Sequence, residues 1–427
     1  MDGHLDILRR YNIWDGGRPD TGLTRNEYVD VLSRLTGNRL VKVLTGQRRA
    51  GKSYVLRQMA MRLVENGVPG KNIFMLNREL EDFSFVTDDK DLDALFREYE
   101  AVVKPEGKVY IFIDEVQNID GWERFVNSYS QDYMKDYELF VSGSNSKMLS
   151  GQLATLLSGR YVDIEICPFS YHEFLEYFKK ERGRQSYSGY IHSSGLPELY
   201  RIDGDDTRRY YVSSLKDTIL LRDIIGRYGV RDVQLLEDLF VYVVNNASNL
   251  MSVNNIANYM KSRGRKVSYD TVTAYLRYME DAHLIHSAFR YNIKGRAVIG
   301  GAVKYYANDL AYRNYLYRGF GYGDGYLLEN AVYMELRRHG FDIYVGNVND
   351  KEVDFVAVKG DRKVYIQAAY QMADGETARR EYASLEAIGD SYEKYVVTMD
   401  EQTYPMNNGI RHVNAWTLDM RLAAENN

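Results

Sequence analysis

A chain of 427 residues, 45% of them hydrophobic, is long enough for about two to four domains with cores of their own. Its formal net charge of −5 excludes a polycation, so any surface that binds nucleic acid must be local. The chain has no run of about eighteen apolar residues, and its single cysteine, Cys167, excludes an intrachain disulfide; we expect a cytoplasmic protein without a membrane span.

The first strong signal along the chain is a phosphate-binding loop. Apolar and β-branched residues at 40–45 predict a strand, and Gly46–Ser53 then matches G-x-x-x-x-G-K-[ST] at every fixed position. A helix is expected at 54–65. Glycines in such a loop let backbone N–H groups surround phosphates, and the helix N-terminus attracts their negative charge. This context predicts ATP binding and not a chance match in a turn.

Two side chains of the loop have expected roles. Lys52 should reach the β- and γ-phosphates of ATP, and the Ser53 hydroxyl should ligate Mg²⁺. The residues expected to contact the nucleotide are Gly46, Gln47, Arg48, Arg49, Ala50, Gly51, Lys52, Ser53 and Tyr54.

Two acidic residues end the next apolar run. Residues 109–113 are all apolar, which indicates a strand buried on both faces of a parallel sheet, and Asp114 and Glu115 follow directly. Ligands of such sheets bind at the carboxyl ends of the strands. We expect Asp114 to hold the magnesium shell and Glu115 to be the base that polarises the attacking water. The alternative is that one of the two merely caps the next helix.

Polar residues also follow a third predicted strand, at 138–141. Ser144 or Asn145 would then lie between the phosphate-binding loop and the acidic pair, where either could orient the water and sense the γ-phosphate. An ordinary Ser/Asn/Gly turn is an equal alternative. Arg160 is a candidate arginine finger, acting in cis or across a subunit boundary of a homo-oligomer, with a solvated arginine as the alternative.

The middle of the chain is predicted to be helical and to end in a winged helix-turn-helix. Helical periodicity covers 171–180, 206–214, 215–228, 233–244, 253–262 and 271–283, and two β-like segments follow. A DNA-reading helix would be 268–281, with Tyr269, Thr273 and Tyr278 on it. Cations that suit phosphate contacts are Lys261, Arg263, Arg265, Lys266 and Arg277, with Lys294 and Arg296 near the wing. The alternative is a winged helix that contacts protein.

The C-terminal part has the layout of restriction-endonuclease-like folds. A helix carries Glu329, a strand carries Asp354, and a further strand spans 363–370. In such folds the third strand supplies a Glu-x-Lys that helps to bind metal and activate water. Here those positions are Gln367-Ala368-Ala369, so the lysine is absent, and Lys363 is a conceivable substitute. We therefore expect a retained fold without nuclease activity.

Taken together, these motifs resemble the bacterial and archaeal AAA-type ATPases that carry a C-terminal domain of unknown function. The resemblance rests on the following segments: 46–53, Ile113–Gln117, Gly121–Glu123, Val141–Asn145, Leu157–Arg160, Pro168–Phe174, Gly195–Glu198, 222–224 and 329–354. It implies an ATPase module, a helical lid, a winged helix and a nuclease-like α/β module. In that family the arginine of the Ser-Gly-Arg segment is the usual finger candidate, so the resemblance favours Arg160.

The predicted fold is multidomain α/β, led by a three-layer parallel-sheet P-loop domain. The predicted boundaries are 1–165 for the ATPase core, 166–230 for the lid, 231–300 for the winged helix and 301–427 for the nuclease-like domain. The predicted function is ATP binding and Mg²⁺-dependent hydrolysis, associated with DNA and coupled to movement of the C-terminal modules. A nucleotide-driven switch that binds a protein partner is the alternative, and a residual DNase is a third.

Overall fold

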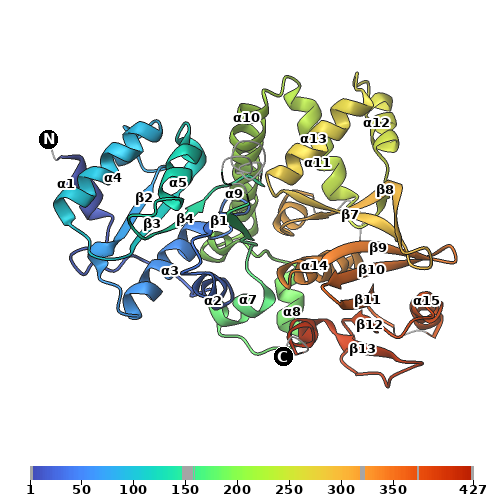
Figure 1. Cartoon of the computed structure of the whole chain (residues 1–427). Coiled ribbons are helices and arrows are strands. Elements are labelled where there is room, and N and C mark those ends of the chain that lie inside the picture. Colours follow the sequence, from blue (N-terminus) through green and yellow to red (C-terminus); the bar gives the residue numbers. More distant parts are fainter. Residues whose placement is uncertain (1–2, 147–156, 158, 318–322, 373–374, 425–427) are drawn as a thin grey trace. The chain divides into compact units, whose positions relative to one another are not determined.

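The computed structural model describes residues 3–146, 157, 159–317, 323–372 and 375–424 (Figure 1). Its internal contacts divide the chain into two compact units, Met1–Ile166 and Cys167–Asn427. Each unit has its own sheet and its own hydrophobic cores.

The first unit is built on a five-stranded parallel sheet with the order β2-β3-β4-β1-β5. Its strands are β1 (Val41–Thr45), β2 (Ile73–Asn77), β3 (Val109–Asp114), β4 (Tyr137–Ser142) and β5 (Tyr161–Glu165). β1 and β4 are buried at every residue, as expected for strands covered on both faces.

Helices cover both faces of this sheet. Those of the first unit are α1 (His4–Arg10), α2 (Asn26–Arg34), α3 (Lys52–Glu65), α4 (Asp89–Val103) and α5 (Trp122–Ser130), with short 3₁₀ turns at Gly70–Asn72, Glu81–Phe83 and Val116–Asn118. One core packs α1, α4 and α5 on one face, and a second core packs α2 and α3 on the other. This is the predicted three-layer α/β arrangement, and its parallel strands bring all their carboxyl ends to one edge.

The second unit contains an eight-stranded mixed sheet with the order β13-β12-β11-β10-β9-β7-β8-β6. Its strands are β6 (Leu250–Met251), β7 (Ile285–Asn292), β8 (Ala297–Ala307), β9 (Asp342–Val348), β10 (Lys351–Lys359), β11 (Arg362–Ala369), β12 (Glu393–Thr398) and β13 (Ile410–Asn414). β7 pairs in parallel with β9 and so joins the β7–β8 hairpin to the C-terminal strands.

The helices of the second unit are distributed over three cores. They are α7 (Tyr171–Phe178), α8 (Arg184–Ile191), α9 (Asp205–Thr218), α10 (Gly226–Tyr228), α11 (Val233–Asn245), α12 (Val253–Ser262), α13 (Tyr269–Asp281), α14 (Asp324–Arg338), α15 (Gly375–Glu386) and α16 (Leu418–Ala423). Short π-helical segments lie at Ile219–Ile225 and Tyr312–Leu316, and 3₁₀ turns at Pro197–Arg201 and Ala415–Thr417. One core contains α7, α8, α14 and α16, a second contains α9, α11, α12 and α13, and a third contains Leu385 of α15.

The predicted subdivision of the second unit does not coincide with these cores. The stretch predicted as a lid, 166–230, contributes α7 and α8 to one core and α9 to another. The predicted boundary at 300/301 falls inside strand β8. Helical periodicity identifies an apolar face but not the element that covers it, so these boundaries could not be placed from the pattern alone.

Candidate active site

The phosphate-binding loop connects β1 to α3 at the carboxyl edge of the parallel sheet. Its two pattern glycines both have positive φ, 141° at Gly46 and 101° at Gly51. A Cβ atom at Gly46 would lie 2.3 Å from the carbonyl oxygen of Ile166, so no larger residue fits there. Gly51 directly precedes the first turn of α3, whose N–H groups face the loop. The expected strand-loop-helix context is therefore present.

Lys52 lies across this loop. Its side chain is buried, and its Nζ donates hydrogen bonds to the carbonyl oxygens of Gly46 at 2.9 Å and Gln47 at 3.1 Å. These bonds hold the ammonium in the concavity of the loop, where it can exchange backbone carbonyls for phosphate oxygens.

A buried arginine supports the loop from the segment before β1. Arg25 is 2% exposed, and its Nη1 donates to the carbonyl oxygen of Ala50 at 2.9 Å. Gln58 of α3 accepts from the Arg25 backbone N–H at 2.9 Å and donates to the carbonyls of Thr21 and Leu23, each at 2.7 Å. Sequence reasoning missed Arg25 and Gln58, because no local pattern marks a side chain that acts through tertiary contacts.

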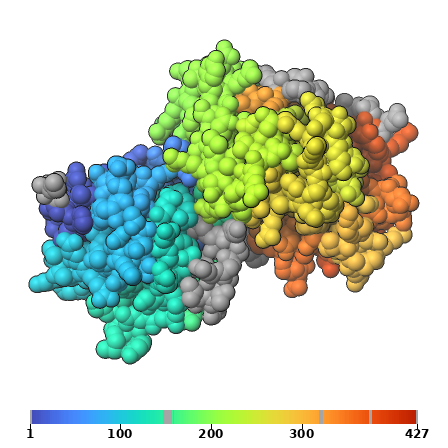
Figure 2. Space-filling model, turned by 90° about the horizontal axis from the view of Figure 1, so that it is seen from above, coloured from blue at the N-terminus to red at the C-terminus, as the bar shows by residue number. Residues whose placement is uncertain are grey.

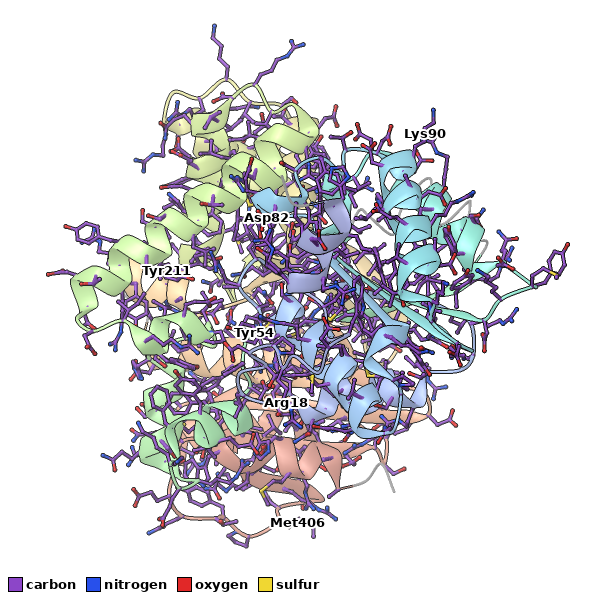
Figure 3. All side chains as sticks on the ribbon, turned by 90° about the vertical axis from the view of Figure 1, so that its left-hand side faces the viewer. Arg18, Tyr54, Asp82, Lys90, Tyr211 and Met406 are labelled. Atoms are coloured by element: carbon purple, nitrogen blue, oxygen red, sulfur yellow. The ribbon has the colours of Figure 1, made fainter. Side chains whose placement is uncertain are left out.

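The segment before β1 also borders a cavity of about 440 Å³ that reaches Ser53 and Asp114. Arg18, labelled in Figure 3, belongs to its lining, as does Arg57 of α3. Arg57 lies 4.2 Å from the ring centroid of Tyr54, which is labelled in the same view. Tyr54 itself donates a hydrogen bond to Asp20 at 3.4 Å.

Asp114 ends β3 within reach of two hydroxyl groups. Both Ser53 and Ser142 hydrogen bond to its carboxylate. Burial, and then the neighbouring Glu115, raises the pKa of Asp114, while Ser142, Ser53 and Lys52 act in the opposite direction. A carboxylate and a hydroxyl that already touch are a hard-oxygen pair of the kind that Mg²⁺ prefers, so the residues present fit this ion.

Glu115 is held by a residue that sequence reasoning missed. It has a left-handed backbone, with φ 54°, and a largely buried side chain. Gln117 Nε2 donates to Glu115 Oε2 at 2.5 Å and approaches the Ser144 hydroxyl at 3.5 Å. Ser144 and Asn145 are buried and follow β4, which lies between β3 and β1 in the sheet. The structure thus brings Lys52, Ser53, the acidic pair and Ser144 to one edge.

Arg160 lies at the opposite edge of the sheet. It precedes β5, whose first residue pairs with Val41 at the start of β1, and whose last residue pairs with Thr45 just before the loop. The two pairs are four positions apart along the strand, which is about 13 Å. The Arg160 side chain is exposed. This position does not suit a contact with ATP bound to the same chain, which leaves two alternatives, a contact across a subunit boundary and a solvated arginine.

The predicted winged-helix surface is accessible. α12 and α13, yellow in Figure 2, form an outer face of the second unit, and Lys261, Arg263, Lys266 and Arg277 are exposed. Lys294 and Arg296 are also exposed at the tip of the β7–β8 hairpin. Arg265 differs, because it forms an ion pair with Asp238 at 2.7 Å.

The predicted nuclease-like residues meet at a second cavity. Glu329, Asp354 and Gln367 all line a space of about 480 Å³. Lys363 does not substitute for the missing lysine there, because its ammonium lies 4.7 Å from the ring centroid of Tyr392 and 6.0 Å from that of Tyr291. The lysine that does line the cavity is Lys304 of β8, which sequence reasoning did not single out.

None of the helices in the described part of the chain has the length and apolar character that a membrane crossing requires.

Comparison with known proteins assigns three consecutive regions. An AAA domain matches residues 38–175, and two domains of unknown function, DUF8612 and DUF4143, match residues 184–321 and 324–418. An uncharacterized protein of Haemophilus influenzae is 33% identical over 382 residues, which cover 88% of this chain and 93% of that protein. An uncharacterized protein of Methanocaldococcus jannaschii is 29% identical over 377 residues, which cover 84% of this chain and 81% of that protein. Among solved structures, a Walker-type ATPase of Pyrococcus abyssi aligns with a TM-score of 0.45 and 16% identity, covering 70% of this chain and 98% of that one.

Proposed function

The chain belongs to a family of proteins that join an AAA-type P-loop domain to two C-terminal domains of unknown function, and on this premise we propose that it binds ATP with Mg²⁺ and hydrolyses it. The observation that carries the proposal is the meeting of Lys52, Ser53, Asp114 and Glu115 at one edge of the first sheet. A cation, a hydroxyl and two carboxylates at that edge are the groups that phosphoryl transfer to water requires.

Each of these residues has a role that follows from its contacts. Lys52 leaves the carbonyls of Gly46 and Gln47 for the β- and γ-phosphate oxygens, while the N–H groups of the loop bind the remaining phosphate oxygens. Ser53 and Asp114 would hold Mg²⁺. The ion supplies positive charge against the phosphates when it is bound.

Glu115 is the residue proposed to accept the proton of the attacking water. Its carboxylate follows Asp114 at the end of β3 and is oriented by Gln117, whose amide also approaches Ser144. A base must lie within hydrogen-bond reach of the water that it deprotonates, so a fixed carboxylate is favoured over a mobile one. Ser144 and Asn145, buried after β4, are the groups proposed to contact the γ-phosphate or the water.

The test compares ATP binding and turnover in the Glu115→Gln variant. The substitution keeps the shape and hydrogen bonding of the side chain but removes the base, so ATP should bind while turnover falls by roughly a hundredfold or more. Exchange of the exposed Glu98 of α4 for Gln is the matched control and should leave turnover unchanged. Full turnover in Glu115→Gln would move the base to another residue.

We further propose that the winged-helix surface binds DNA and that ATP controls this binding. Exposed cations at 261–266, on α13 and at the hairpin tip suit contacts to phosphates, which provide affinity without sequence specificity. Arg265 is left out of this surface, because Asp238 already neutralises it. The nucleotide state would act by moving the C-terminal modules relative to the ATPase core.

Binding of random-sequence duplex DNA, measured at several salt concentrations with and without ATP, tests this second proposal. Replacing both Lys261 and Lys266 with Ser should reduce the slope of log affinity against log salt by roughly two. Replacing the exposed Lys90 and Lys104 of the first unit is the charge-matched control and should leave the slope unchanged. If the wild-type protein and both variants bound DNA equally, and salt did not change their affinity, the result would favour a switch that binds a protein partner.

A further inference from the structure

A buried lysine lies among three carboxylates in the second unit. We call the four residues the Lys304 cluster: Lys304 of β8, Glu329 of α14, and Glu352 and Asp354 of β10. Lys304 Nζ lies 2.6 Å from Glu352 Oε1, 2.9 Å from Glu329 Oε1 and 3.6 Å from Asp354 Oδ1. The Lys304 side chain is 4% exposed, so solvent screens these attractions little.

The two buried carboxylates of the cluster have further donors. The Tyr306 hydroxyl donates to Glu329 Oε1 at 2.9 Å, and the Ala368 backbone N–H donates to Asp354 Oδ2 at 2.9 Å. Gln367 accepts a hydrogen bond from the Asp354 backbone N–H at 3.3 Å. It stands where a restriction-endonuclease-like fold would carry an acidic residue. The cluster is therefore a connected set of polar groups, in which the ammonium is the central cation.

The pKa shifts of these groups show that the ammonium and the carboxylates stabilise one another. Burial alone would lower the pKa of Lys304, but Glu329, Asp354 and Glu352 outweigh it and raise the pKa above its usual value. Burial, and then Glu329, raises the pKa of Asp354 to about 8, while Lys304 opposes this shift. Without Lys304, three carboxylates would face one another in a partly buried cavity, which is strongly unfavourable.

A divalent ion and the Lys304 ammonium would compete for the same position. A metal needs oxygen ligands at about 2.0–2.6 Å around one point, and the ammonium already occupies the point that the three carboxylates share. Across the described residues, no three or more His, Cys, Asp and Glu side chains are arranged to hold a metal ion.

We propose that Lys304 is the permanent cation of this cluster, replacing a divalent metal and tying the β7–β8 hairpin to α14 and β10. β8 and β10 are separated in the sheet by β7 and β9, so the cluster spans two intervening strands, and α14 packs against both β8 and β10 (Figure 1). The winged-helix hairpin and the C-terminal strands consequently move as one body. Any motion driven by ATP must leave this connection intact.

Thermal unfolding of the full-length protein, with and without millimolar Mn²⁺ or Mg²⁺, tests the proposal. Without nucleotide, neither ion should stabilise the second unit of the wild-type protein. Lys304→Met keeps the apolar stem but removes the charge, and should lower the unfolding temperature of the second unit by roughly 10 °C. Mn²⁺ should restore part of this loss, because the freed carboxylates then have room for a cation. Adding Asp354→Asn should remove the rescue.

Two further comparisons make the result specific to Lys304. Lys351→Met alters an exposed lysine on the same strand as Glu352 and Asp354, and should change neither stability nor the response to Mn²⁺. Metal analysis of the wild-type protein requires no variant, so it decides the question even if Lys304→Met does not fold. It should find less than stoichiometric Mn²⁺ or Mg²⁺ after dialysis without nucleotide.

Three results would overturn the proposal. One is a wild-type protein that binds one equivalent of Mn²⁺ and loses it in Asp354→Asn. The second is a Lys304→Met variant that is as stable as wild type. The third is metal-dependent cleavage of supercoiled DNA that disappears in Asp354→Asn, since the cluster would then be a working metal site with Lys304 as one of its reactive groups.

Discussion

Gln117 holds the carboxylate of Glu115, the base that we propose for ATP hydrolysis. Glu115 has a left-handed backbone, a conformation that a residue with a Cβ adopts only at a cost of about 1 kcal/mol or more. This conformation turns the chain away from β3 immediately after Asp114. The amide of Gln117 then fixes the Glu115 carboxylate at 2.5 Å. We therefore propose that Gln117 is a positioning residue, which acts on ATP through Glu115.

Gln117→Ala should lower kcat for ATP hydrolysis by roughly tenfold to a hundredfold, the range expected for a lost hydrogen bond to a charged group. KM for ATP should stay nearly the same, because Gln117 does not contact the phosphate-binding loop in any described interaction. Steady-state kinetics separate the two constants. A variant that loses ATP affinity and keeps kcat would show that Gln117 supports the loop and not the base.

At the residue scale, the motif residues could be predicted from sequence and their partners could not. Gly46–Ser53 and the Asp114-Glu115 pair are recognisable because the chemistry demands those residue types at adjacent positions. Their partners are different. Arg25 and Lys304 contact atoms of other elements, and Gln117 contacts Glu115 within a turn whose geometry the sequence does not reveal. No spacing rule connects Lys304 with Glu329 or Asp354, so the pattern suggested Lys363 instead.

Two central strands of the first sheet are joined by a buried ion pair. Lys42 of β1 and Glu138 of β4 both have fully buried side chains, and Lys42 Nζ donates to Glu138 and, at 3.1 Å, to Asn38 Oδ1. Glu138 also accepts from Lys108 Nζ at 3.1 Å and from the Gly37 backbone N–H at 2.9 Å. These bonds compensate for moving both charges out of water.

Glu138→Leu should lower the free energy of unfolding of the first unit by about 3–5 kcal/mol, because Lys42 is left as a buried, uncompensated charge. The double variant with Lys42→Met should recover much of this loss, since both charges are then absent. Denaturant unfolding of the two single variants and the double variant gives the coupling free energy. Strictly additive losses would mean that the pair does not interact.

At the element scale, the sequence predicted the strands and helices that bury one continuous apolar face. β3, α3, α11 and α13 are of this kind, and their observed bounds lie within a few residues of those expected. The five-stranded order and the joining of β7 to β9 could not be predicted, because both depend on pairings between distant segments. The continuous helical stretch from α9 to α10 also contains a π-helical segment that no periodicity indicated.

For the whole molecule, we propose that Arg160 acts between copies of the chain in an assembly. The residue lies at the amino edge of the sheet, away from the loop of its own chain, and its side chain is exposed. If Arg160 completes the active site of a neighbouring copy, Arg160→Ala should reduce turnover by roughly a thousandfold without weakening ATP binding.

Mixing variants tests whether Arg160 acts across subunits. Lys52→Ala lacks a working loop but retains Arg160, whereas Arg160→Ala has the reverse defect, so a mixture of the two inactive proteins should regain part of the turnover. Size-exclusion chromatography with ATP should show a homo-oligomer. A protein that stays monomeric with ATP at all concentrations and keeps full turnover would rule out this arrangement.

The most direct test of the central claim is calorimetric titration of the full-length protein with ATP and Mg²⁺, comparing wild type with Lys52→Ala. Lys52 is the buried cation held in the concavity of the loop, so the variant should bind ATP roughly a hundredfold more weakly or not measurably. Lys90→Ala, an exposed lysine on α4, is the control and should bind like wild type. Equal ATP affinity in wild type and Lys52→Ala would contradict the assignment of this loop as the nucleotide-binding site.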